Sequence, residues 1–227
     1  MFTHVYLWLN RFMDILYTDE HILIVNKPAG LPVLPDGWEK GAPYLVKLLE
    51  EEYGKIWIVH RLDKVTSGII VFARTAAAHR HLNMQLEKHE VQKIYHAIVN
   101  GVPTWEEKTA KHPLRANVGH RHRTIVDTKT GKPSETRFKV IKRYQSQALV
   151  EASPVTGRTH QVRVHAMALG YSLVGDHLYG ASETDLIARP ALHAYSLSFT
   201  HPESKELIKF TASYPSDFRA TLDRLNG

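Results

Sequence analysis

The chain has 227 residues, no cysteine, and 29 Lys and Arg against 23 Asp and Glu, for a formal net charge of +6. Its 43% apolar and 23% charged residues are typical of a soluble globular protein and exclude a fibrous or disordered chain. The absence of cysteine excludes disulfides and thiolate zinc sites and suits a reducing cytoplasm, and no apolar run is long enough to span a membrane.

The length favours one domain, residues 1–227, because a chain of this size buries most of its apolar surface in a single core. Phe2–Leu9 is apolar, but no basic residue precedes it and no small-residue cleavage site follows, so it is not read as a signal peptide. Met13 lies just before the first predicted strand, so residues 1–12 are expected to be either an N-terminal extension or the product of an upstream start.

The first predicted elements are a hairpin and a helix. Ile15–Tyr17 and Ile22–Asn26 predict two strands joined by a short polar loop. The proline-rich residues 27–37 then predict irregular chain. Pro43–Tyr53 has leucines on one face and charges off it, which predicts a short amphipathic helix closed by Gly54.

The stretch that follows joins two buried strands through a polar loop. Ile56–Val59 and Ile69–Ala73 are β-branched and aromatic, which favours strands. Between them, several donors surround the carboxylate of Asp63. The residues alone leave two interpretations: Asp63 caps backbone N–H groups near Thr66 and Ser67, or it is retained for chemistry.

A helix, capped by Thr75, is predicted over Ala76–His89, and a strand over Val91–Val99. Lys93, Tyr95, Ala97 and Val99 share one face of this strand because side chains alternate. A tyrosine in such a strand is usually part of the core.

Positive charge is concentrated in the next segment. Residues 108–143 hold eleven Lys and Arg against two acids, a net charge of +9. We expect residues 108–133 to contact a phosphate backbone, and the alternative is a solvated hairpin.

The remaining elements are strands over Ser134–Arg143 and Gln147–Pro154, a helix ending at Leu169, a strand over Leu207–Ala212 and a helix over Ser216–Leu225. Arg158 is expected at the start of this helix, where it and Arg163 point about 140° apart and cannot serve one carboxylate.

Three motifs together resemble one known family. His60-Arg61-Leu62-Asp63 with Thr66-Ser67-Gly68, Lys93-x-Tyr95-x-Ala97 and Gly157–His165 are similar, in order, to the motifs of the RluA family of RNA pseudouridine synthases. Asn26–Gly30 and Gly175–Gly180 also follow the family pattern, so the resemblance covers residues 14 to about 215.

The resemblance implies an α+β fold, a single pseudouridine-synthase-like domain with a mainly antiparallel mixed sheet, flanking helices and a catalytic cleft. It implies a short member of the family without the S4-type RNA-binding domain. Asp63 is then the catalytic residue, Arg163 its ion-pair partner, and Tyr95 the residue that stacks on the uracil. The expected substrate-binding residues are Arg61, Arg158, Arg115, Arg121, Arg123 and Lys129.

The expected reaction converts uridine to pseudouridine in ribosomal RNA, transfer RNA or both, in the cytoplasm, by a monomer without cofactor or metal. Asp63 either attacks C1′ to form an ester or removes the 2′ proton, and the sequence does not choose. The alternative function is a noncatalytic RNA-binding protein or RNA chaperone. A nucleoside hydrolase would have no use for the basic segment, and a kinase is rejected because Leu62 displaces the aspartate from the kinase spacing.

Overall fold

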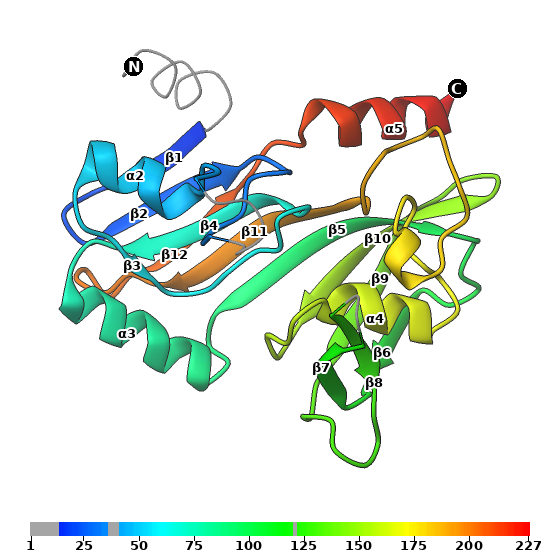
Figure 1. Cartoon of the computed structure of the whole chain (residues 1–227), viewed down its shortest axis with the longest axis horizontal. Coiled ribbons are helices and arrows are strands. Elements are labelled where there is room, and N and C mark those ends of the chain that lie inside the picture. The colour runs from blue at the N-terminus through cyan, green and yellow to red at the C-terminus, as the bar shows by residue number, and fades with distance from the viewer. Residues whose placement is uncertain (1–13, 36–40, 120–121) are drawn as a thin grey trace. The chain divides into compact units, whose positions relative to one another are not determined.

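A computed structural model describes residues 14–35, 41–119 and 122–227 (Figure 1). The predicted N-terminal extension, residues 1–12, lies outside them. The described residues form two compact units, and two chain segments build each unit. Unit 1 holds residues up to 92 together with 194–213, and unit 2 holds residues 93–193 together with 214–227.

Unit 1 is organised around strands in the order β1-β2-β4-β11-β12, and β3 also pairs with β4. The pairs β1–β2, β2–β4, β3–β4 and β11–β12 are antiparallel. The strands are β1 Asp14–Thr18, β2 Ile22–Lys27, β3 Trp57–Ile58, β4 Ser67–Ala73, β11 Leu192–Thr200 and β12 Leu207–Thr211. All seven residues of β4 are buried, as its continuous apolar sequence predicts.

Helices α2 (Leu45–Tyr53) and α3 (Ala76–Glu87) complete unit 1. The Thr75 hydroxyl accepts a hydrogen bond from the Ala78 N–H at 3.1 Å, so the predicted N-cap is confirmed. The strand predicted over Ile56–Val59 is reduced to the two residues of β3, because only Trp57 and Ile58 pair with β4.

Unit 2 contains a second run of strands in the order β5-β10-β9-β6, with antiparallel registers between successive strands. Its strands are β5 Gln92–Asn100, β6 Glu107–Ala110, β9 Thr136–Arg143 and β10 Gln147–Pro154. Strands β7 (Leu114–Val118) and β8 (Arg123–Val126) form a separate two-stranded sheet, which extends as a hairpin in Figure 1.

Helix α4 (Gln161–Ala168) covers one face of this unit's strands, and Val162 and Ala166 pack in one cluster with Ala97 and Val99 of β5. The 3-10 helix η1 (His177–Tyr179) follows, and α5 (Ser216–Asn226) buries Phe218 in a second cluster with Ile98.

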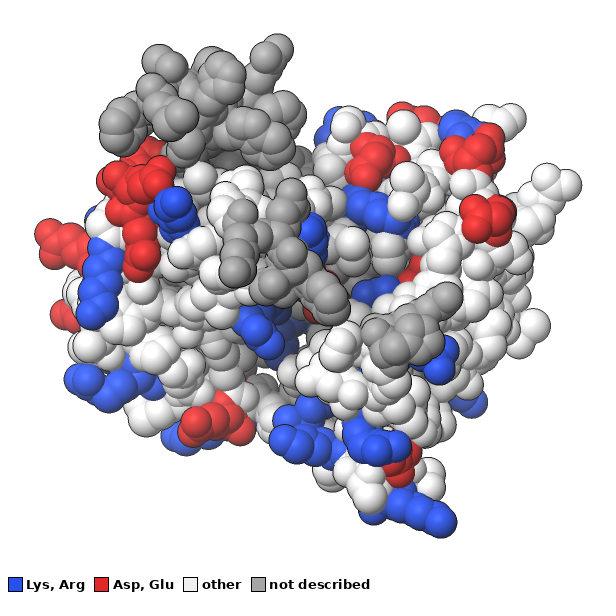
Figure 2. Space-filling model, in the orientation of Figure 1, with Lys and Arg blue, Asp and Glu red and all other residues white. Residues whose placement is uncertain are grey.

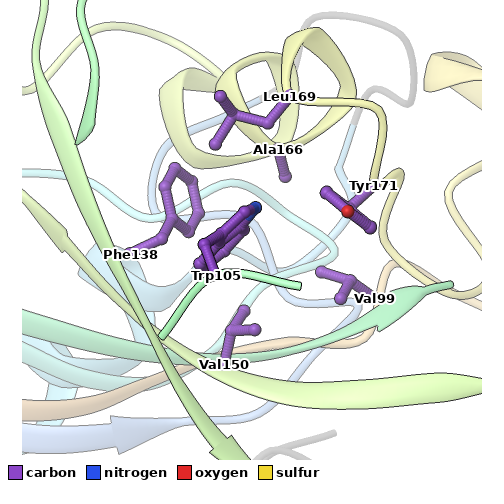
Figure 3. A pocket seen from close by; sticks show the side chains of 7 residues that line it. All are labelled: Val99, Trp105, Phe138, Val150, Ala166, Leu169 and Tyr171. Carbon is purple, nitrogen blue, oxygen red and sulfur yellow. The ribbon is translucent and has the colours of Figure 1, made fainter. Parts of the chain in front are cut away.

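A small apolar cavity remains under α4. Figure 3 shows Trp105 at its centre, with Val150 on the strand side and Ala166 on the helix side. Its volume of about 10 Å³ is room for at most one water, and apolar walls offer that water no partners. We therefore regard it as a packing gap.

Helices combined with antiparallel strands confirm the predicted α+β class. No helix within the described ranges is long and apolar enough to cross a membrane. That residues 1–227 act as one catalytic domain stays a prediction.

Candidate active site

The Asp63 loop is held at both ends by unit 1. The Nε2 of His60 accepts a hydrogen bond from the Val71 N–H of β4 at 3.2 Å, which fixes the start of the loop. The Thr66 N–H donates to the Asp63 carbonyl at 3.0 Å and closes a tight turn. Leu62 is buried, whereas Asp63 is half-buried, so the turn presents the carboxylate at the edge of the core.

Lys27, the last residue of β2, also holds this loop in place, a role that was not evident from its position in the sequence. Its side chain is fully buried. The ammonium donates to the carbonyls of Pro28 at 2.7 Å, Leu31 at 2.9 Å and Lys64 at 3.3 Å. The Gly30 N–H also donates to the Lys64 carbonyl, at 2.8 Å. The residue directly after Asp63 is therefore tied to the end of β2.

Replacing Lys27 with methionine is expected to lower the free energy of unfolding by about 2 to 4 kcal/mol, because three carbonyls lose the buried ammonium that donates to them. Chemical denaturation measures this loss. The same substitution at Lys47, which is exposed on α2, should change the stability by less than about 0.5 kcal/mol. Equal stabilities of the two variants would show that Lys27 does not hold the loop.

Gly68 ends the loop at a point where no side chain fits. Its φ of +115° is outside the range that other residues adopt readily, and a Cβ would stand 2.2 Å from the Ala194 carbonyl oxygen of β11. The glycine of the motif is therefore required by the backbone of the neighbouring strand.

Tyr95 lies on β5 in unit 2, opposite Ala152 of β10. It is half-buried and packs against the cluster that contains Ala97 and Val99, so its ring is on the α4 face of the strands. A half-buried ring at the end of this cluster keeps one part in the core and one part accessible.

Arg163 points from α4 into a buried ion pair with Asp176. The Nε donates to Oδ2 and Nη2 donates to Oδ1, each at 2.7 Å, and the side chains are 5% and 1% exposed. The guanidinium also lies over the ring of Tyr179, with Cζ 4.9 Å from the ring centre. This bidentate pair fixes the plane of the guanidinium and uses two of its five N–H groups.

Tyr179 connects Arg163 to the hairpin of β7 and β8. Its hydroxyl accepts the Thr124 N–H at 2.9 Å and lies 2.8 Å from the Nδ1 of His160. Since the oxygen already accepts from Thr124, its proton is available to Nδ1. Burial raises the pKa of Tyr179, so the phenol stays protonated at neutral pH.

The structure corrects the predicted setting of Arg158. Helix α4 begins at Gln161, and His160 before it has a φ of 53°. Arg158 therefore lies in the preceding loop, exposed, and the angle expected between two residues of one helix does not apply. Arg61, two positions before Asp63, is also exposed.

The predicted RNA-binding residues of the β7–β8 hairpin differ in their surroundings. The Nε of Arg115 donates to Asp127 at 2.7 Å, and Asp127 also caps the turn through the backbone N–H groups of Lys129 and Thr130. Hydrogen bonds from Thr130, supported by Arg115, lower the pKa of Asp127 to about 2. Arg123 is exposed.

Figure 2 shows Lys and Arg side chains gathered over the part of unit 2 where β7 and β8 extend. The side chain of Lys129 is exposed as well. Arg121 lies outside the described residues.

Asp63 belongs to unit 1, and Tyr95 and Arg163 belong to unit 2, so their joint action stays a prediction. Sequence reasoning missed the roles of Lys27, Asp176 and Tyr179. Each had a signal, because Lys27 lies in the Asn26–Gly30 motif and Asp176 and Tyr179 lie in the Gly175–Gly180 motif.

Comparison with known proteins identifies the family. The family model described as RNA pseudouridylate synthase matches residues 21–168. The dual-specificity RNA pseudouridine synthase RluA of Escherichia coli is 40% identical over 209 residues, which cover 91% of this chain and 94% of that protein. The ribosomal large subunit pseudouridine synthase D of Neisseria meningitidis is 39% identical over 221 residues, which cover 90% of this chain but only 59% of that protein.

Solved structures agree on the fold. Human RNA pseudouridylate synthase domain containing 4 aligns with a TM-score of 0.80 at 24% identity, covering 100% of this chain and 98% of that chain. The three sequence motifs, the fold and the matched relatives are consistent with one another. This chain belongs to the RluA family of RNA pseudouridine synthases.

Proposed function

We propose that this chain converts uridines to pseudouridine in structured RNA, with ribosomal RNA, transfer RNA or both as the substrate. The observation that carries the proposal is family membership with the motif residues Asp63, Tyr95 and Arg163 all present. The two bacterial relatives named above modify the large ribosomal subunit or carry dual specificity, as their names state.

Asp63 is the proposed catalytic carboxylate. Pseudouridine formation breaks the bond between C1′ and N1, turns the uracil and rejoins it through C5, so the uracil must stay bound between the two steps. The reaction is an isomerisation without net oxidation, and we propose that it needs no cofactor and no metal. An ionised Asp63 either forms an ester at C1′ or removes the 2′ proton.

The other motif residues support this chemistry. Tyr95 would stack on the uracil after the nucleotide leaves the RNA helix, a step that costs a few kcal/mol. Arg61, next to Asp63, would fill the vacated position. We propose that Arg163 pairs with Asp63 and keeps it ionised, since a cation within about 4 to 6 Å favours the charged carboxylate.

Arg115, Arg121, Arg123, Lys129 and Arg158 are the proposed phosphate contacts. We propose that the protein works as a monomer, because the contacts that hold the substrate are made with the RNA itself. We propose that it acts in the cytoplasm, because ribosomal and transfer RNA are found there. Residues 1–227 would then serve as one catalytic domain.

The direct test incubates the purified chain with unmodified transcripts of large-subunit ribosomal RNA and of transfer RNA, and maps pseudouridine by chemical sequencing. New pseudouridine at defined positions in either transcript is the expected result. Tight RNA binding without any pseudouridine would instead support the noncatalytic RNA-binding protein.

Replacing Arg123 and Lys129 with glutamine should weaken RNA binding and flatten its salt dependence. Each lost phosphate contact reduces the slope of log affinity against log salt by about 0.7 to 0.9, so the double variant should lose about 1.4 to 1.8. Filter binding across a salt series measures this slope.

Glutamine at both Arg137 and Lys139 provides the control, because these cations of β9 already pair with Glu135 and Glu107. Their replacement should leave the slope nearly unchanged. If the hairpin variant kept the parent's slope, the charge on β7 and β8 would be a solvated surface only.

A further inference from the structure

Lys93 lies near Tyr95 on β5 and is the one Lys or Arg of that strand. The two residues are separated by one position, so they point to the same face of the strand, about 7 Å apart. That face is the one that packs against α4, because Ala97 and Val99 continue the same alternation into the cluster with Val162. A nucleotide whose base lies on Tyr95 would therefore have Lys93 within reach.

The ammonium of Lys93 lies against the loop that leads into α4. Its Nζ is 3.9 Å from the position that a Cβ would take on Gly157. Gly157 and Arg158 are both exposed, so this part of the loop is open to solvent on its outer side. Lys93 itself is half-buried. Because Gly157 has no side chain to block the way, a ligand from solvent can reach the Lys93 ammonium past it.

Within the described ranges, this ammonium forms no hydrogen bond and no ion pair. The buried cations Lys27 and Arg163 differ from the half-buried Lys93: Lys27 donates to three carbonyls, and Arg163 is paired with Asp176. Removing a cation from water without a partner is costly, and burial accordingly lowers the pKa of Lys93. An anion bound beside Lys93 would remove that cost.

We propose that Lys93 binds a phosphate of the RNA backbone at the nucleotide whose base stacks on Tyr95. This inference rests on the proposed function. A nucleotide carries its base on C1′ and its phosphates on O5′ and O3′ of the same ribose, so a single nucleotide can contact both side chains. A backbone phosphate is fully charged before any reaction and can offset the desolvation of the ammonium, which a neutral uracil carbonyl cannot do to the same degree. The absence of a side chain at Gly157 leaves room for the phosphate oxygens.

The test compares Lys93→Met with the parent protein on the large-subunit ribosomal RNA transcript. The variant should bind about tenfold more weakly at low salt, and its slope of log affinity against log salt should be flatter by about 0.7 to 0.9. The melting temperature of the free variant should be equal to that of the parent or higher, because an unpaired, partly desolvated charge has been removed. A lysine with only a structural role would give the opposite change in stability.

Lys139→Met is the matched control. Lys139 is exposed on β9, alternates with the core residue Phe138, and is paired with Glu107 at 3.5 Å. Its replacement should change the RNA affinity by less than about twofold. Lys93→Arg keeps the charge and should recover most of the salt dependence.

Two results would overturn the phosphate contact. In the first, Lys93→Met has the RNA affinity and the salt slope of the parent. In the second, its RNA affinity is weaker but its salt slope is unchanged, which would mean that the ammonium contacts a neutral part of the RNA. The proposed function is tested separately by the pseudouridine formed by the parent. If the parent protein makes no pseudouridine but Lys93→Met still flattens the salt dependence of RNA binding, the proposed activity is refuted and the phosphate contact is supported.

Discussion

Replacing Asp63 with asparagine is expected to abolish pseudouridine formation while RNA binding stays within about tenfold of the parent. The amide preserves the size of the side chain but is neither a nucleophile nor a base. The loop should keep its conformation, because the bond from the Val71 N–H to the His60 ring, the bond from the Lys27 ammonium to the Lys64 carbonyl and the backbone bonds of the turn all remain. Quantitative pseudouridine mapping under single-turnover conditions measures the loss.

Asp223→Asn, on the exposed face of α5, is the matched control and should retain the parental activity. A measurable single-turnover rate for Asp63→Asn would exclude Asp63 as nucleophile or base. Loss of RNA binding together with activity would instead indicate that the loop had moved.

Asp176→Asn should lower the free energy of unfolding by about 3 to 5 kcal/mol, because the buried Arg163 guanidinium loses the carboxylate of its bidentate pair. Both side chains of this pair are almost fully buried, so water cannot replace the lost partner. Activity should fall as well, since the fork with Asp176 fixes the orientation of Arg163. Denaturant titration and pseudouridine mapping measure the two effects.

Burial is the variable that this prediction tests, and the pair of Arg224 with Asp185 supplies the comparison. Its distance of 2.8 Å is similar to that of the buried pair, but its side chains are 49% and 86% exposed. Asp185→Asn should therefore cost less than about 1 kcal/mol. Equal costs for the two variants would contradict the importance of the buried pair.

A double variant separates the stability of the Arg163–Asp176 pair from its chemistry. Arg163→Met with Asp176→Leu replaces the buried ions with apolar side chains of similar volume, a change that often leaves stability unaltered or increases it. We expect stability to return towards that of the parent while pseudouridine formation stays lost. Recovery of activity along with stability would show that Arg163 has only a structural role.

Periodicity and local signals were sufficient for most of the secondary structure. The hairpin of β1 and β2, helix α3 with its Thr75 cap, and strands β9 and β10 lie where alternation and capping residues predicted them. These elements depend on neighbours in the sequence, so a sequence pattern can reveal them. The family motifs likewise identified Asp63, Tyr95 and Arg163 as candidates.

The features that the sequence did not predict depend on contacts between distant segments. Helix α4 starts later than expected because His160 adopts a left-handed conformation while its ring meets Tyr179, 19 residues away. The fork between Arg163 and Asp176 spans 13 residues. Lys27 contradicts the rule that lysine is exposed, and only the fold brings three carbonyls to its ammonium.

The division of each compact unit between two chain segments has a consequence for synthesis on the ribosome. Unit 1 is complete only when residues 194–213 are available, although its first segment ends at residue 92. The apolar strand β4 must therefore wait for β11, its neighbour in the sheet, while about a hundred residues of unit 2 are still being translated. Pairing between such distant segments slows folding and leaves strand edges exposed. A nascent chain that stalls before residue 194 should therefore be recognised by chaperones and proteases as unfinished, whatever its first 92 residues have achieved.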